Sequence, residues 1–472
     1  MNVLLISTYE LGRQPFGLAS PAAWLRGAGA TVTCLDLSRE PLPHEPVRSA
    51  DLIAFYVPMH TAARLAIEIL PAVRSLNPTA HLCFYGLYAP VNETYLRKLG
   101  GATILGGEFE TGLVSLLERL LKDQAVAAGF SPAAHACRPE GRRYFVQGEP
   151  IISLARQEFI RPDRDGLPPL SRYARLLLPN GEKRVVGYTE ASRGCRHLCR
   201  HCPIVPVYNG VFRIVQKDVV LDDIRQQVAA GAEHITFGDP DFFNGPRHAL
   251  EVVAALHSEF PSLTYDVTIK IEHLLKHAQH LSTLRATGCL FVTSAVESVD
   301  DRVLGQLEKG HTFADFAAVI ELFREVGLYL SPTFVAFTPW TTLHGYIELL
   351  RCLVEMDLIE QVAPIQLAIR LLLPAGSRLL DLPEVRRRVG PFDESALVYP
   401  WANDDPRVDG LCRTVQQLVE EGEKRGDSRR DIFGRIWALA HEAAGFDATA
   451  LPDASDRLAR AAIPYLTEPW FC

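Results

Sequence analysis

The chain has 472 residues, of which 48% are hydrophobic and 22% are charged, as in a globular protein of about three domains. This composition excludes a disordered, fibrous or disulfide-stapled protein. Lys and Arg total 48 against 56 Asp and Glu, so the formal net charge is −8, which argues against nucleic acid or an anionic membrane as the principal partner.

The N-terminus predicts a buried strand and not an export signal. No basic region precedes the apolar run 3–6, and polar residues follow it at once. No apolar run reaches the roughly 18 residues that a membrane span needs. Seven of the ten cysteines are scattered in mostly apolar settings, which fits a reducing compartment without disulfides. We therefore expect a cytoplasmic protein.

Residues 1–125 alternate apolar strands with helices, which predicts an open, doubly wound parallel sheet of α/β class. Ser20 and Pro21 predict the start of the first helix, because Ser is a preferred cap and Pro suits the first turn. The predicted strands are 3–6, 31–35, 52–57, 81–85 and 102–105, and the predicted helices are 22–29, 65–76 and 112–122.

Residues 126–183 are rich in Pro, Gly and Arg without a period, and we interpret them as a linker or wrapping segment. Residues 184–385 return to alternation, which predicts a six-strand partial TIM-type barrel; a second doubly wound sheet is the competing interpretation. Residues 386–472 predict helices at 411–423 and 431–444, followed by a non-helical tail. The six barrel strands are expected at 185–192, 234–239, 265–271, 290–298, 329–338 and 365–373, and the helices between them at 219–230, 248–260, 273–287, 315–326 and 344–356.

Three cysteines, Cys195, Cys199 and Cys202, follow the first barrel strand at the spacing C-x3-C-x2-C. Thiolates suit iron–sulfur clusters or zinc. A four-iron cluster normally takes four cysteines, so three local thiols leave one iron open to a small molecule. The position is the active-site end of a parallel barrel. A zinc site completed by His197 or His201, and a closed ferredoxin-type cluster with a distant fourth cysteine, are the alternatives.

This motif on such a barrel resembles the radical S-adenosylmethionine (SAM) superfamily. The resemblance implies a [4Fe–4S] cluster on the three cysteines, chelation of its open iron by SAM, and reductive cleavage of SAM to a carbon radical. It further implies an enzyme that modifies a peptide or small metabolite, with a reductant such as flavodoxin or ferredoxin. The alternative from a different class is a non-catalytic zinc or iron–sulfur electron-transfer protein.

The resemblance also implies which residues contact SAM. Gly238, Asp239 and Asp241 stand where the family carries a short motif of glycine and acid that receives the SAM amino group, and an Asp-Pro turn is the plainer interpretation. Glu297 and Ser298 resemble the polar pair near the SAM ribose or methionine moiety; for Ser298 a helix cap is the alternative. Lys270 is a candidate for substrate contact, although a surface lysine is the simpler expectation.

Residues 1–125 resemble the cobalamin-binding-type domain that precedes the core in one radical SAM class. The cobalt-ligating motif Asp-x-His-x-x-Gly is absent, because none of the 15 histidines has Asp two positions before it. Cobalamin is therefore a possible cofactor without a ligand motif, and a cofactor-free scaffold is the alternative.

The tail that ends in Cys472 resembles a radical SAM family whose members end in Cys-Cys-Ala-Glu-Pro or Cys-selenocysteine-Ala-Glu-Pro. We expect a selenocysteine codon read as a stop after Cys472, with a natural terminus as the alternative. A thiol–selenol pair is a soft nucleophile, so Cys472 is a candidate catalytic residue. This resemblance implies an alternative reaction, transfer of the 3-amino-3-carboxypropyl group of SAM to trivalent arsenic.

Overall fold

The computed structural model describes residues 1–127, 148–446 and 463–467, which form two compact units. The first unit comprises residues 1–10 and 14–168, and the second comprises residues 11–13 and 169–472. Cys472 and the proposed selenocysteine position after it lie outside the described residues.

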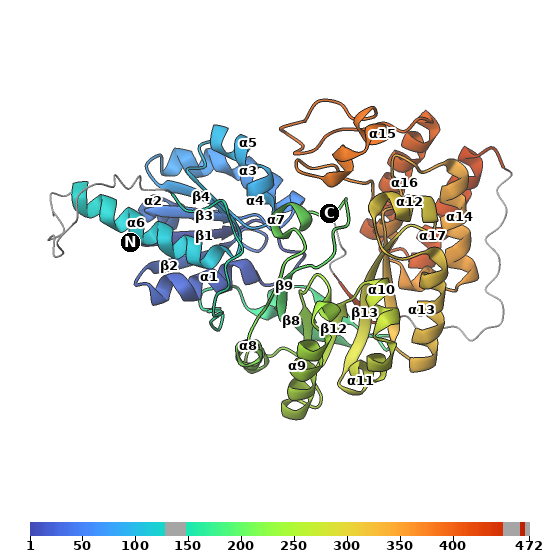
Figure 1. The fold of residues 1–472 in the computed structure, drawn as a ribbon, viewed down its shortest axis with the longest axis horizontal. Helices are drawn as coiled ribbons and strands as arrows, with labels where there is room; N and C mark the ends of the chain where they lie inside the picture. The colour runs from blue at the N-terminus through green and yellow to red at the C-terminus, as the bar shows by residue number, and fades with distance from the viewer. Residues whose placement is uncertain (128–147, 447–462, 468–472) are drawn as a thin grey trace. The chain divides into compact units, whose positions relative to one another are not determined.

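The first unit is a parallel sheet with helices on both faces, which confirms the doubly wound prediction (Figure 1). The strand order is β2-β1-β3-β4-β5-β6. The strands are β1 (Asn2–Ser7), β2 (Thr31–Asp36), β3 (Leu52–Tyr56), β4 (His81–Tyr85), β5 (Thr103–Gly107) and β6 (Ile152–Ser153). The helices are α1 (Phe16–Gly27) and α6 (Phe109–Ala127) on one face, α3 (His60–Leu76) and α5 (Glu93–Lys98) on the other, with the short α2 (His44–Ser49) and α4 (Tyr88–Val91).

Helix α1 begins at Phe16, so the prediction that Ser20 and Pro21 start it is wrong. Phe16 and Leu18 are buried in the core, and their burial extends the helix upstream of the local capping signal. Pro21 lies inside the helix. The hydroxyl of Ser20 donates to Oε1 of Glu110 at 2.7 Å instead of capping the helix.

The second unit is a curled sheet in the order β14-β13-β12-β11-β8-β7-β15, whose first five members run parallel. This arrangement confirms the predicted partial barrel. The parallel strands are β8 (Lys183–Thr189), β11 (His234–Phe237), β12 (Thr264–Thr268), β13 (Cys289–Glu297) and β14 (Tyr329–Phe334), and the antiparallel ones are β7 (Arg175–Leu177) and β15 (Tyr465–Leu466). The crossover helices are α8 (Lys217–Ala229), α9 (Pro246–Glu259), α10 (Ile271–Lys276), α11 (Leu281–Ala286), α13 (Phe313–Val326) and α14 (Leu343–Glu355).

The sixth predicted strand is reduced to one parallel bridge, between Phe337 and Arg370. A short 3-10 helix, Pro364–Leu367, occupies the first part of the segment, with Pro364 at its start, where proline is well tolerated. The helix predicted over 273–287 is interrupted by a 3-10 turn between α10 and α11. The C-terminal helices are present as α16 (Pro406–Arg425) and α17 (Arg429–Ala443).

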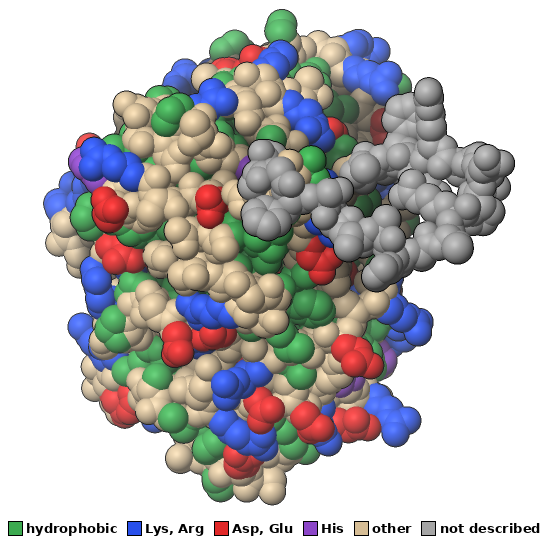
Figure 2. All heavy atoms as spheres, turned by 90° about the vertical axis from the view of Figure 1, so that its left-hand side faces the viewer, with side chains coloured by type: hydrophobic (Ala, Val, Ile, Leu, Met, Phe, Trp, Pro, Cys, Tyr) green, Lys and Arg blue, Asp and Glu red, His purple; other side chains and the backbone are tan. Residues whose placement is uncertain are grey.

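None of the helices in the described ranges is long and apolar enough to cross a bilayer. On the face drawn in Figure 2, basic and acidic side chains are interspersed among apolar ones.

Candidate functional site

The three clustered cysteines lie on one loop between the short antiparallel strands β9 (Ser192–Gly194) and β10 (Phe212–Ile214). Gly194 turns the chain into this loop with a φ of 72°, and a Cβ there would lie 2.4 Å from the carbonyl oxygen of Val211, so the turn requires glycine. The loop follows β8 and therefore lies at the C-terminal end of the parallel strands. All three residues are free thiols; Cys195 and Cys199 are buried and Cys202 is half-buried.

Asp239, at the end of β11, holds the start of this loop. Its side chain is buried; Oδ1 accepts from the Ser192 hydroxyl at 2.5 Å and Oδ2 accepts from the Ala191 amide at 2.9 Å. Burial raises the pKa of Asp239 to about 7, against the effect of these two hydrogen bonds. The contacts that the structure gives Asp239 thus position the loop.

Two buried lysines lie beside the thiols. Nζ of Lys270 is 3.8 Å from Sγ of Cys199, and Lys270 is only 7% exposed, so the expectation of a surface lysine is wrong. Burial raises the pKa of the Cys202 thiol to about 12; the neighbouring Cys199 and Cys195 also raise it, and Lys309 lowers it. The three thiols are therefore close enough to act on one another, and ammonium groups offset part of their negative charge.

Glu297 ends β13 and joins the same cluster of charges. Its Oε1 accepts from Nε2 of His201 at 3.0 Å and from Nζ of Lys309 at 3.3 Å. Burial acts to raise the pKa of Glu297, but Lys309 and His201 lower it to about 2, so this carboxylate is ionised. The adjacent Ser298 accepts from the amide of Asp300 at 3.0 Å.

Helix α12 (Asp301–Leu307) is capped by Asp300 and not by Ser298. The side chain of Ser298 thus closes a turn. Gly238 leaves room for the ring of Tyr188 on β8, because a Cβ at Gly238 would lie 1.8 Å from the Tyr188 hydroxyl oxygen. The structure therefore gives both Gly238 and Ser298 local structural contacts.

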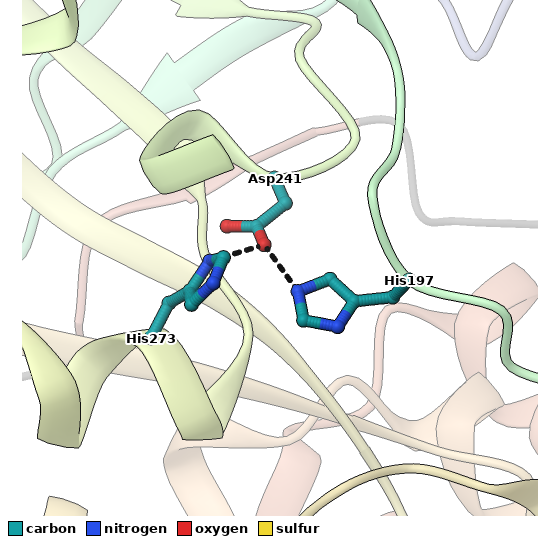
Figure 3. A group of neighbouring side chains, drawn as sticks. All are labelled: His197, Asp241 and His273. Carbon is teal, nitrogen blue, oxygen red and sulfur yellow. Dashed lines mark ion pairs between the residues drawn. The ribbon is translucent and has the colours of Figure 1, made fainter. Parts of the chain in front are cut away.

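His197, Asp241 and His273 converge in one group (Figure 3). His197 lies in the cysteine loop, Asp241 follows β11, and His273 is in the first turn of α10. Oδ2 of Asp241 is 2.7 Å from Nδ1 of His273 and 3.4 Å from Nε2 of His197. The sequence did not predict a role for His273. The one feature that could have indicated such a role is its position shortly after a predicted barrel strand.

The two histidines considered as a fourth ligand to the thiols approach carboxylates instead. Nε2 of His197 approaches Asp241, and Nε2 of His201 bonds Glu297. Neither geometry supports a zinc site made of the three cysteines and one of these rings.

Residues 189–341 match the model of the Radical SAM superfamily. No curated protein sequence matches the chain.

Among solved structures, the fold is similar to that of OxsB, described as a cobalamin-dependent S-adenosylmethionine radical enzyme with aqua-cobalamin and SAM bound. The TM-score is 0.68 at 15% identity, over 89% of this chain and 67% of that one. It is also similar to the radical SAM methyltransferase TsrM from Kitasatospora setae, with cobalamin and a [4Fe-4S] cluster bound, where the TM-score is 0.54 at 17% identity over 75% of this chain and 70% of that one. At these identities the likeness is one of fold. Residues 189–341 therefore carry a radical SAM domain, and such a domain implies an enzyme that uses a [4Fe–4S] cluster and SAM as cofactors.

Proposed function

We propose that Cys195, Cys199 and Cys202 bind a [4Fe–4S] cluster through three of its irons and leave the fourth iron to SAM. The observation that carries this proposal is a single loop of three free thiols at the C-terminal end of the parallel strands, with Lys270 and Lys309 buried beside it. Three thiolates are one fewer than a closed four-iron cluster takes.

The spacing of the thiols supports a cluster over a zinc ion. Tetrahedral zinc, with Zn–S bonds of about 2.3 Å, would hold its sulfur ligands within about 4 Å of one another. Among the described residues, the potential ligands that converge within 4.8 Å are His197, Asp241 and His273, and the three thiols do not form such a group. A wider spacing fits a cluster, in which each sulfur has an iron of its own.

The chemistry that a reduced cluster and SAM supply together is one-electron cleavage of the sulfonium, which yields a carbon radical. The chain's own residues prepare the place for it. Asp239 holds the loop, Lys270 and Lys309 stabilise negative charge on the thiolates, and Glu297 keeps the Lys309 ammonium paired. Because these groups are buried, their interactions are stronger than they would be in water.

For the SAM contacts we favour Glu297. Its carboxylate is ionised and bonds His201, the residue directly before Cys202, so an ammonium group beside the loop would find an acceptor there. Gly238, Asp239 and Ser298 have structural contacts that account for them. Asp241 faces two histidines.

The proposed substrate is a peptide or small metabolite, with a flavodoxin- or ferredoxin-type protein as reductant. The decisive experiment is anaerobic reconstitution with iron and sulfide, followed by SAM and a strong reductant. We expect about four irons per chain and SAM cleavage in the wild-type protein and in Cys352→Ser, whose half-buried thiol on α14 is the matched control. Cys199→Ser should lose both. Zinc without iron, or a loaded cluster that never cleaves SAM, would overturn the proposal.

Cobalamin in the first unit is a separate hypothesis. The sheet order reverses beside β1, where doubly wound sheets bind ligands. Near the ends of the neighbouring strands, Tyr56, Tyr85 and Phe109 pack ring against ring, with centroids 5.0 to 6.0 Å apart. Titration with aquacobalamin tests the hypothesis: a shifted absorption spectrum supports cobalamin binding, and an unchanged spectrum supports a cofactor-free scaffold.

A further inference from the structure

We propose that His197, Asp241 and His273 bind one divalent transition-metal ion, at a site separate from the three thiols. The three side chains come from a loop, a strand end and a helix start, and they point toward one another (Figure 3). This inference goes beyond the radical chemistry, which requires no second metal.

The distances match those that one metal ion imposes on its ligands. Metal–nitrogen and metal–oxygen bonds of about 2.0 to 2.2 Å place neighbouring ligand atoms about 2.9 Å apart in octahedral geometry and about 3.4 Å apart in tetrahedral geometry. The observed separations from Oδ2 of Asp241 are 2.7 Å to His273 and 3.4 Å to His197. All three ligand atoms lie within 4.8 Å of one another.

The same three atoms approach one another as ion pairs of Asp241 with the two imidazoles, but without the geometry of hydrogen bonds. Nε2 of His197, Oδ2 of Asp241 and Nδ1 of His273 are buried, and in the described part of the chain none makes a hydrogen bond of acceptable geometry. Asp241 is 0% exposed and His273 is 7% exposed. Buried polar atoms are normally satisfied, and a buried carboxylate needs a cation. One metal ion among the three atoms would satisfy both requirements.

Neighbouring groups hold the ligands in place. Oδ1 of Asp241 accepts from the amide of Phe243 at 3.3 Å, which leaves Oδ2 directed at the histidines. Oε2 of Glu272 lies 3.6 Å from Nδ1 of His197, the ring nitrogen on the other side from the proposed metal. A carboxylate beside the ring nitrogen that does not face the metal commonly orients a metal-binding histidine.

The ligand set indicates the class of metal. Two imidazoles and one carboxylate suit zinc, iron(II) or cobalt(II), and three protein ligands leave at least one position open. The open position would take an oxygen or nitrogen donor, such as a water molecule or a carboxylate of the substrate. His197 belongs to the loop that holds Cys195 and Cys199, so a ligand bound at this site would lie on the cluster side of the sheet.

The test is cobalt(II) binding to the reconstituted, iron-loaded protein, with zinc as competitor. We expect one cobalt per chain in addition to the cluster irons, and an X-ray absorption spectrum with nitrogen and oxygen ligands, imidazole among them, and no sulfur. His273→Ala should weaken cobalt binding by about 100-fold or more. Even mutation of a residue that only hydrogen-bonds a metal ligand typically lowers metal affinity about 10- to 100-fold. His277→Ala is the matched control: its ring centroid is 5.7 Å from that of His273, and it is outside the group. This variant should change cobalt affinity less than about threefold, well below the loss expected from mutating a residue that hydrogen-bonds a metal ligand.

Three results would overturn the inference: no cobalt bound to the iron-loaded wild-type protein, cobalt bound through sulfur, or equal losses in both variants. If His273→Ala does not fold, the absorption spectrum of the wild-type protein still decides the outcome. Iron content and SAM cleavage are measured on the same samples. An intact, active cluster without cobalt binding therefore contradicts this inference alone, whereas loss of the cluster contradicts the proposed function.

Discussion

Glu297 and Lys309 form a buried ion pair whose two halves depend on each other. Nζ of Lys309 is 3.3 Å from Oε1 of Glu297, and the side chains are 4% and 9% exposed. Removing one partner of such a pair leaves a buried charge and costs about 3–5 kcal/mol, whereas replacing both is often nearly neutral. Glu297→Gln should therefore lower the free energy of unfolding by that amount in urea titrations of the cluster-free protein.

The double variant Glu297→Gln/Lys309→Met should recover most of this loss. Both single variants and the double variant are compared under the same conditions, so that the coupling between the residues is measured directly. Losses that simply add would mean that the two charges do not stabilise each other.

Titration of His311 should make the free energy of unfolding depend on pH, in a range where Glu297 does not titrate. Burial, with Lys309 and Lys270 nearby, lowers the pKa of His311 from 6.5 to about 4, against the opposing effect of Glu297. A folded-state pKa below the unfolded one means that the unfolded chain binds the extra proton, so stability is lost as the pH falls below about 6.5.

The loss attributable to His311 between pH 7 and pH 5 is about 2 kcal/mol. His311→Gln removes the titrating group, so its free energy of unfolding should depend less on pH by that amount. Urea titrations of both proteins at the two pH values measure the difference. Parallel pH profiles for the two proteins would show that His311 is not the group responsible.

The cysteine loop, at the scale of a structural element, depends on Asp239 of the neighbouring strand end. In Asp239→Ala the Ala191 amide and the Ser192 hydroxyl both lose their buried acceptor, at a cost of about 1–3 kcal/mol for each lost hydrogen bond. We expect less iron retained after reconstitution and unchanged SAM affinity in the molecules that are loaded. Full iron content with weakened SAM binding would instead favour the direct SAM contact that the sequence predicted.

The elements differ in how far their sequence determines them. The parallel strands were predictable because each is a run of apolar residues that are consecutive in the sequence. The cysteine motif was predictable because its spacing can be recognised without knowing any tertiary contact. The first turn of α1 was not predictable, because burial of Phe16 and Leu18 in the core decides it. The role of His273 and the burial of Lys270 were not predicted, because their partners, Asp241 and Cys199, are far away in the sequence.

The molecule consists of two compact units, and the proposed cluster and metal sites belong to only one of them. The first has its own parallel sheet and a core that includes Leu5, Leu52 and Leu113. The second contains every described residue of the proposed cluster and metal sites. Ligands stabilise the unit that binds them, by an amount that depends on their affinity for the folded state. Loading the cluster should therefore act on one unit only.

Calorimetry of the whole chain with and without its cluster tests this division. We expect more than one unfolding transition, as is usual when a chain contains several domains, and cluster loading should raise the Tm of only one of them. Phe84→Leu identifies the other transition, because Phe84 is fully buried in β4 and its ring stacks on Phe55 with centroids 5.1 Å apart. This variant should lower the Tm of the transition that the cluster leaves unchanged. A single transition that responds to both changes would mean that the two units unfold together, and that stability gained at the thiols is shared by the entire chain.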